Sequence, residues 1–242
     1  MGRTPTLGEA GLAWIRGLVR REGLLRGFSS ALKGSCELAL DYLPSRRRLR
    51  YGDIDYDFEY RVNTTWARPS LSVRLRELFT RGKYQPSEPQ LFHEILDRLN
   101  IRYEDFTFLD LGSGKGRTLL MASDYPFRRI IGAEIVPELH AIADENVTAY
   151  RSQQQKCLQL ETWLGDAREF PFPAEPLVVY LFNPFPEDVL RDVLERLHAS
   201  YAAQPREIRI AYHNLVHGAL LRATAFLEEL ERTEQFAIYR VR

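Results

Sequence analysis

Residues 106–120 read FTFLDLGSGKGRTLL, a short apolar run that reaches Asp110 and continues into Gly112, Gly114 and Gly116. Glycine loses more backbone entropy on folding than any other residue, so a cluster of glycines marks a required backbone shape or a close approach by a ligand. The residues before the cluster predict a strand, and those after it predict the start of a helix. We therefore expect a ligand-binding loop between a strand and a helix.

The chain beyond this loop alternates between strand and helix patterns. Strands are predicted at 106–111, 129–135, 158–163, 176–182 and 206–214, and helices at 89–99, 116–124, 137–150, 187–201 and 216–223. Such alternation predicts a parallel sheet with right-handed crossovers. Residues 235–241 predict a final strand, and those before it fit either a helix or an antiparallel hairpin partner. The predicted fold class is Rossmann-like, doubly wound α/β, with a mostly parallel sheet and an antiparallel C-terminal strand.

The N-terminal part of the chain differs from this domain. Residues 1–83 predict a helical and irregular extension, and residues 84–242 predict the Rossmann-like domain. Residues 1–50 hold ten Lys or Arg against four acids, a net charge of +6, and their helical periodicity covers 8–43. The simplest interpretation is a pair of helices packed on the domain with a solvated arginine face. A membrane surface or an acidic partner is the alternative.

Residues 51–89 combine aromatic and charged side chains without a clear period, apart from a short helical stretch. Tyr60, Trp66 and Tyr84 in this region fit two hypotheses equally well. They form either an aromatic lid over a bound ligand or a hydrophobic cluster beneath the N-terminal helices.

The bulk composition excludes some classes of protein. The 242 residues carry a net charge of zero, with 45% hydrophobic and 27% charged side chains, as in ordinary globular proteins. No apolar run reaches the ~20 residues of a membrane span, and arginines interrupt the apolar residues near the N-terminus, so no signal peptide is expected. The two cysteines, Cys36 and Cys157, form no paired pattern. These features favour a reducing compartment, and we expect a cytoplasmic protein.

Two common glycine loops fit the sequence poorly. A phosphate-binding P-loop needs Ser or Thr after its lysine, whereas Lys115 precedes Gly116. A dinucleotide loop needs a third glycine where this chain has Arg117.

The loop instead resembles motif I of the class I S-adenosylmethionine-dependent methyltransferases. Asp110 ends the first predicted strand, Glu134 ends the second, and Asp166 follows the third. FNPFP, residues 182–186, follows the fourth strand, where this family places its acceptor-side motif. The resemblance covers residues 84–242, and the longer phrases are similar to a bacterial branch of unassigned substrate.

The resemblance implies S-adenosylmethionine as the cofactor. Asp110 would lie near its ammonium group, Glu134 would accept bonds from the ribose hydroxyls, and Asp166 would face the adenine amine. Ile135 would pack on the adenine ring, with the Ala167 amide beside it. The implied cofactor site comprises Tyr84, Asp110, Leu111, Gly112, Ser113, Gly114, Glu134, Ile135, Asp166, Ala167 and Asn183. From the residues alone, Asp166 also fits a plain turn cap.

The acceptor side is predicted at Asn183, Pro184 and Phe185. These residues resemble the (D/N)PP(Y/F) motif of amino-directed methyltransferases, which implies a nitrogen acceptor. The sequence departs from that motif because Phe185 stands third and Pro186 fourth. We assign no general base. We also assign no metal, because His213 and His217 lack the glutamate of a zinc-binding HExxH helix.

Two other functions remain open from the sequence. One is a nicotinamide-dependent oxidoreductase, and the other is a cofactor-binding module without turnover. The methyl acceptor is equally open among a protein side chain, an RNA base and a small amine or acid. The basic N-terminal arm could supply phosphate contacts, although the net charge of −6 on the remaining residues disfavours nucleic acid. Oligomeric state is not predicted.

Overall fold

The computed structural model describes residues 54–65, 86–182 and 184–242. The chain divides into two compact units, one of residues 1–58 and 65–85 and the other of residues 59–64 and 86–242. The predicted N-terminal helices lie outside the described residues, as do Trp66, Tyr84 and Asn183. The domain boundary at residue 84 therefore stays a prediction.

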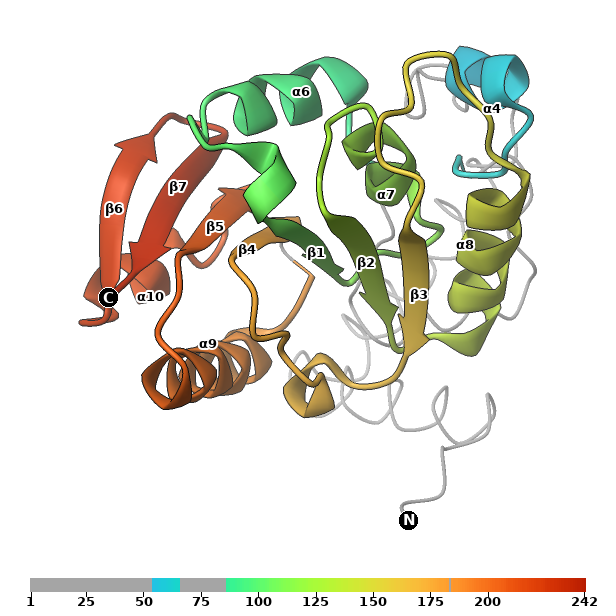
Figure 1. The fold of residues 1–242 in the computed structure, drawn as a ribbon. Coiled ribbons are helices and arrows are strands. Elements are labelled where there is room, and N and C mark those ends of the chain that lie inside the picture. The colour runs from blue at the N-terminus through green and yellow to red at the C-terminus, as the bar shows by residue number, and fades with distance from the viewer. Residues whose placement is uncertain (1–53, 66–85, 183) are drawn as a thin grey trace, which may run out of the picture. The chain divides into compact units, whose positions relative to one another are not determined.

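A seven-stranded sheet in the order β3-β2-β1-β4-β5-β7-β6 forms the centre of the larger unit (Figure 1). Its strands are β1 (Thr107–Leu111), β2 (Arg129–Glu134), β3 (Leu160–Leu164), β4 (Leu177–Phe182), β5 (Ile208–His213), β6 (Leu227–Arg232) and β7 (Phe236–Val241). Strands β1 to β5 pair in parallel, and β7 pairs antiparallel with both β5 and β6. The fold class and the antiparallel C-terminal strand predicted from the sequence are confirmed.

Helices cover both faces of this sheet (Figure 1). They are α6 (Pro89–Asp97), α7 (Arg117–Ala122), α8 (Pro137–Ala149), α9 (Glu187–Ala203) and α10 (Gly218–Ala223), with short 3-10 turns at Tyr103–Asp105 and Ala167–Glu169. Phe92 of α6 packs edge-on against Tyr180, and Leu119 of α7 lies over Gly132. Apolar side chains of α9 and α10 pack with the opposite face.

The alternation of side chains along β1 explains where its acid lies. Leu109 and Leu111 join the apolar cluster on the α9 face, and Phe108 packs with the aromatic side chains on the α6 face. Because neighbouring side chains point to opposite faces of a strand, Asp110 shares the α6 face with Phe108. It stands level with Gly132 of β2 and Tyr180 of β4. The register thus places one carboxylate beneath α7 in the buried sheet.

The structure corrects one sequence-based expectation and decides between two alternatives that the sequence left open. Residues 54–60, predicted to be irregular, form the short helix α4 (Ile54–Tyr60). Residues 227–232, for which a helix was one alternative, form β6 of an antiparallel hairpin. The glutamates of β6 favour a helix by local propensity, but pairing with the buried strand β7 outweighs that preference.

Candidate functional site

The glycine loop has a backbone conformation that residues with a side chain adopt only at a cost in free energy. Gly112, Gly114 and Gly116 have φ angles of 90°, 55° and 81°, all in the left-handed region. A Cβ atom on Gly112 would lie 2.5 Å from the Cβ of Pro184. The two motifs recognised in the sequence, the glycine loop and the acceptor-side motif, therefore meet in space.

The amide groups of the loop are largely occupied within the protein. The amides of Gly112 and Ser113 donate to the carbonyl oxygen of Ala133, at 2.8 and 3.0 Å. The Gly114 amide donates to Oε2 of Glu134 at 2.8 Å, and the Gly116 amide donates to the Ser113 carbonyl at 2.8 Å. A phosphate-binding loop works by pointing such amides at its ligand. This loop offers close approach by its backbone rather than an anion cradle.

Glu134 connects the end of β2 to the loop. Its side chain is only 7% exposed. Oε2 accepts from the Gly114 amide, and Oε1 accepts from the Val136 amide at 2.8 Å. Burial raises the pKa of Glu134, and these backbone donors oppose that rise. Each carboxylate oxygen has a second lone pair, so Glu134 can still accept hydrogen bonds from a ligand.

Asp110 lies beside Glu134 and is also buried. The pKa of Asp110 is raised to about 7, chiefly by burial and also by the charge of Glu134, while the Thr118 hydroxyl opposes this rise by donating to Oδ2. Two interacting carboxyl groups with raised pKa values create a site at which a bound cation is stabilised. The Asp110–Glu134 pair is thus the electrostatic centre of the candidate site.

Asp166 lies in a different environment. It caps the turn Ala167–Glu169, where Oδ1 accepts from the Arg168 amide at 2.9 Å. Both of its oxygens also accept from the Arg168 guanidinium. These bonds lower the pKa of Asp166. The turn cap that the sequence allowed is the arrangement in this structure, and Ala167 is buried beside it.

Two apolar side chains lie exposed where the second and third strands end. Ile135 follows Glu134 and is 60% exposed, and Leu164 is 49% exposed. Glu134 and Leu164 stand level in the sheet, so these two apolar side chains come from adjacent strand ends. Exposed aliphatic groups beside a carboxylate that can bind ribose are suited to a flat aromatic ring.

A buried polar chain that the sequence analysis missed follows β4 and β5. The Tyr180 hydroxyl lies 3.2 Å from the Ser87 hydroxyl and 2.8 Å from Nδ1 of His213. The His213 ring stacks on Phe182, with 4.1 Å between centroids. Burial lowers the pKa of His213 to about 4, so this imidazole is neutral at physiological pH. The sequence signals for this chain were a single tyrosine within the apolar run of β4 and a histidine at the end of the fifth predicted strand.

Phe185, predicted for the acceptor side, packs partly buried against the apolar cluster on the α9 face. Pro184 lies against Gly112. Asn183 lies outside the described residues, so its predicted role is not tested by the geometry.

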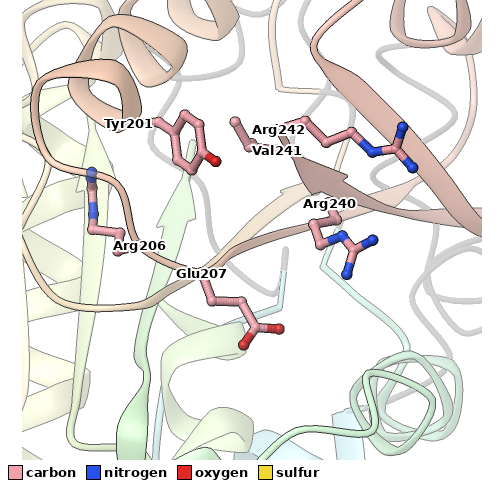
Figure 2. A pocket seen from close by; sticks show the side chains of 6 residues that line it. All are labelled: Tyr201, Arg206, Glu207, Arg240, Val241 and Arg242. Carbon is pink, nitrogen blue, oxygen red and sulfur yellow. The ribbon is translucent and has the colours of Figure 1, made fainter.

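A hollow lies at the opposite edge of the sheet (Figure 2). It has a volume of about 410 Å³ and is lined by Tyr201, Arg206, Glu207, Arg240, Val241 and Arg242. Glu207 precedes β5, and Val241 ends the antiparallel strand β7, so the hollow is remote from the glycine loop. Arg240 and Arg242 are both paired with Glu228. This hollow contains none of the predicted site residues.

The described residues contain neither a candidate metal cluster nor a candidate membrane span. No group of three or more His, Cys, Asp or Glu side chains is arranged there to hold a metal ion. No described helix has both the length and the apolar character that a membrane crossing requires.

One family model matches part of the chain. Residues 70–159 match the family model described as histone methylation protein DOT1. The matched segment includes the glycine loop, Asp110 and Glu134. A search of the curated proteins gave no match.

Several solved structures are similar to this chain, and some of them are described as methyltransferases or methylases. An RNA methyltransferase from Salinibacter ruber, in complex with S-adenosyl-L-homocysteine, is 18% identical over 65% of this chain and 92% of that chain, with a TM-score of 0.45. A protein from Pyrococcus horikoshii OT3 is 16% identical over 63% and 91%, with a TM-score of 0.47. A ribosomal protein L11 methylase from Lactobacillus delbrueckii subsp. bulgaricus is 13% identical over 66% and 80%, with a TM-score of 0.47.

The family match confirms the resemblance of this chain to the class I S-adenosylmethionine-dependent methyltransferases.

Proposed function

We propose that this protein transfers a methyl group from S-adenosylmethionine to an acceptor nitrogen. The observation that carries the proposal is the electrostatics of the glycine loop. Four of its backbone amides donate hydrogen bonds to oxygens of the protein itself, and the buried Asp110–Glu134 pair lies beside them. Such a loop favours a cationic ligand over an anionic one.

This preference distinguishes between the two cofactor classes. S-adenosylmethionine carries an ammonium and a sulfonium group, whereas a dinucleotide carries a pyrophosphate that requires free amides at a helix start. The Gly114 amide, which such a pyrophosphate would need, donates to Glu134. The loop therefore supports S-adenosylmethionine and disfavours the oxidoreductase alternative.

The remaining parts of the cofactor have suitable partners. Glu134 keeps lone pairs for the ribose hydroxyls, and the exposed Ile135 side chain is available to an adenine face. Asp166 would have to share its oxygens between Arg168 and the adenine amine. We therefore assign Asp110 and Glu134 the main share of the cofactor affinity, and Asp166 and Ala167 a smaller one.

Methyl transfer needs alignment more than acid–base chemistry. The lone pair of the acceptor nitrogen attacks the methyl carbon, the carbon–sulfur bond breaks, and its electron pair stays on sulfur as a neutral thioether. The proton lost from nitrogen passes to water. The protein contributes by holding the two reactants in line. In this chain the contact between Gly112 and Pro184 brings the cofactor loop next to the acceptor motif.

A nitrogen acceptor is supported by Asn183, Pro184 and Phe185, which resemble the motif of amino-directed methyltransferases. The matching family model is described as a histone methylation protein, and this description supports a protein as the acceptor. Of the acceptors left open, a protein amine is the one we favour.

We also propose a cytoplasmic location, which the two cysteines in no paired pattern support.

Isothermal titration with S-adenosylmethionine, S-adenosylhomocysteine and NAD tests the cofactor. Wild type should bind both adenosyl ligands, and Glu134→Ala should lose that binding. Glu145→Ala is the matched control, because Glu145 is an exposed glutamate of α8. Absence of adenosyl binding in folded wild type would reject the proposal, and binding of NAD would favour the oxidoreductase. Adenosyl binding without methyl incorporation into any protein, RNA or small amine would favour a module without turnover.

A further inference from the structure

The two cations of the glycine loop are buried. Lys115 is 1% exposed and Arg117 is 3% exposed, although charged residues at the start of a helix are normally solvated. A buried charge is costly unless it is paired or fully hydrogen-bonded. The partners of these two side chains therefore indicate what their burial achieves.

Both cations contact one short segment more than 50 positions earlier in the chain. Lys115 Nζ donates to Oδ1 of Asn63 at 3.0 Å. Arg117 Nε donates to the Thr64 hydroxyl at 2.7 Å. Lys115 and Arg117 flank Gly116, whose φ angle is 81°. Residues 63–64, which we call the clasp, are thus bonded on both sides of the left-handed glycine that begins α7.

Asn146 of α8 joins the clasp to the backbone of the loop. Its Nδ2 donates to the Lys115 carbonyl at 2.9 Å and to the Asn63 carbonyl at 3.1 Å. Its Oδ1 accepts from the Asn63 amide at 2.8 Å. An amide side chain has two N–H donors and one acceptor oxygen, so every polar atom of Asn146 is used. Asn146 is 4% exposed, which makes these bonds costly to break.

The loop is therefore held from two directions. On one side β2 contributes the Ala133 carbonyl and the Glu134 carboxylate. On the other side the clasp and Asn146 hold Lys115. Glycines have no side chains that could anchor the loop, so the contacts from β2, the clasp and Asn146 limit its conformations. A loop that is ordered before the ligand arrives binds with a smaller entropic cost.

We propose that Asn63, Thr64 and Asn146 are positioning residues of the cofactor site, and that the ordering of the clasp at residues 63–64 is coupled to cofactor affinity. The inference rests on the proposed function, because it assumes that the glycine loop binds S-adenosylmethionine. Coupling of this kind is reciprocal, so a bound cofactor also stabilises the clasp.

Titration of full-length variants with S-adenosylhomocysteine tests the inference. Asn146→Ala removes three hydrogen bonds and is expected to weaken binding about tenfold or more, and Asn63→Ala roughly threefold to tenfold. Asn63→Asp keeps an oxygen for Lys115 and should bind as wild type does. Gln153→Ala, at an exposed amide without a contact to the loop, is the matched control.

Hydrogen exchange provides a readout that general destabilisation would not reproduce. S-adenosylhomocysteine should slow exchange at the amides of Asn63 and Thr64 in wild type, and less so in Asn146→Ala. Asn63 is an exposed residue, so Asn63→Ala is expected to fold. If Asn63→Ala and Asn146→Ala both bound S-adenosylhomocysteine with wild-type affinity, this inference would be overturned and the proposed function would stand. Absence of binding by wild type would overturn the proposed function and this inference with it.

Discussion

The acids at the ends of the first three strands look equivalent in the sequence, but they lie in opposite environments. Asp110 and Glu134 are buried beside the glycine loop, and burial raises both pKa values. Asp166 is more accessible, and the Arg168 side chain lowers its pKa. The position after a strand does not set the chemistry of an acid; its neighbours across the sheet do.

The difference bears on where cofactor affinity originates. The carboxylates of Asp110 and Glu134 repel each other, so a bound cation would stabilise their charged forms. The negative charge of Asp166 is already compensated by Arg168. Removing an acid from the first environment should therefore cost more binding than removing the acid from the second.

Glu134→Gln should have the largest effect. The substitution keeps the size of the side chain but removes the charge and directs an N–H₂ group at a backbone amide donor. Hydrogen bonds to charged groups contribute about 1.5–3 kcal/mol, so binding of S-adenosylhomocysteine should weaken roughly 10- to 100-fold. Titration calorimetry measures this change. Unaltered affinity in a folded variant would remove Glu134 from the site.

Asp110→Asn should have an intermediate effect that depends on pH. The folded pKa of about 7 lies above the ordinary value of 3.8, so the folded state binds more protons than the unfolded state between these values. The unfolding free energy of wild type should therefore fall as pH rises from 4 to 8. The amide introduced by the substitution does not titrate, so the unfolding free energy of the variant should decrease less as pH rises from 4 to 8. Thr118 can still donate to the amide oxygen.

The same titration should appear in ligand binding. In the proposed site, ionised Asp110 would attract the ammonium group of the cofactor, so wild-type affinity should increase between pH 6 and 8. Asp110→Asn should show a flatter profile, with affinity reduced about tenfold at pH 8. Thermal unfolding and calorimetry over this pH range provide both measurements. Identical pH profiles for the two proteins would show that Asp110 is not the titrating group.

Asp166→Ala should have the smallest effect. Loss of the turn cap is expected to cost about 0.5–1 kcal/mol of stability, and affinity for S-adenosylhomocysteine should fall less than about threefold. Because the folded pKa is lowered, the stabilisation is present at neutral pH and is lost as the solution becomes acidic. Denaturant unfolding at pH 7 and pH 3 checks this sign. A loss of affinity as large as that of Glu134→Gln would contradict the proposed difference between the two environments.

Local patterns were sufficient for much of the fold. Strand β4 lies within PLVVYLF, a continuous apolar run, because helices cover both of its faces. The glycines of the loop were predicted to adopt a special backbone, and all three have positive φ. The hairpin of β6 and β7 was one of two alternatives, because LEELER has a helical composition and becomes a strand only by pairing with β7.

Contacts between distant segments were the part that the sequence did not reveal. Thr118 donates to Asp110 from within the helix that follows the loop, and Tyr180 meets Ser87 across 93 positions. Lys115 and Arg117 are charged residues at a helix start, which are normally solvated. Both side chains contact the clasp, and no local pattern connects residues 63–64 to the loop.

The sequence by itself determined the order of strands and helices, the backbone shape of the glycine loop and the three acids that follow the strands, because hydrophobic periodicity and glycine conformation are local properties. Tertiary structure decided which acids are buried together, which amides remain available and which distant segment holds the loop. Those properties depend on strand register and on desolvation, and both are set by neighbours that lie far apart along the chain.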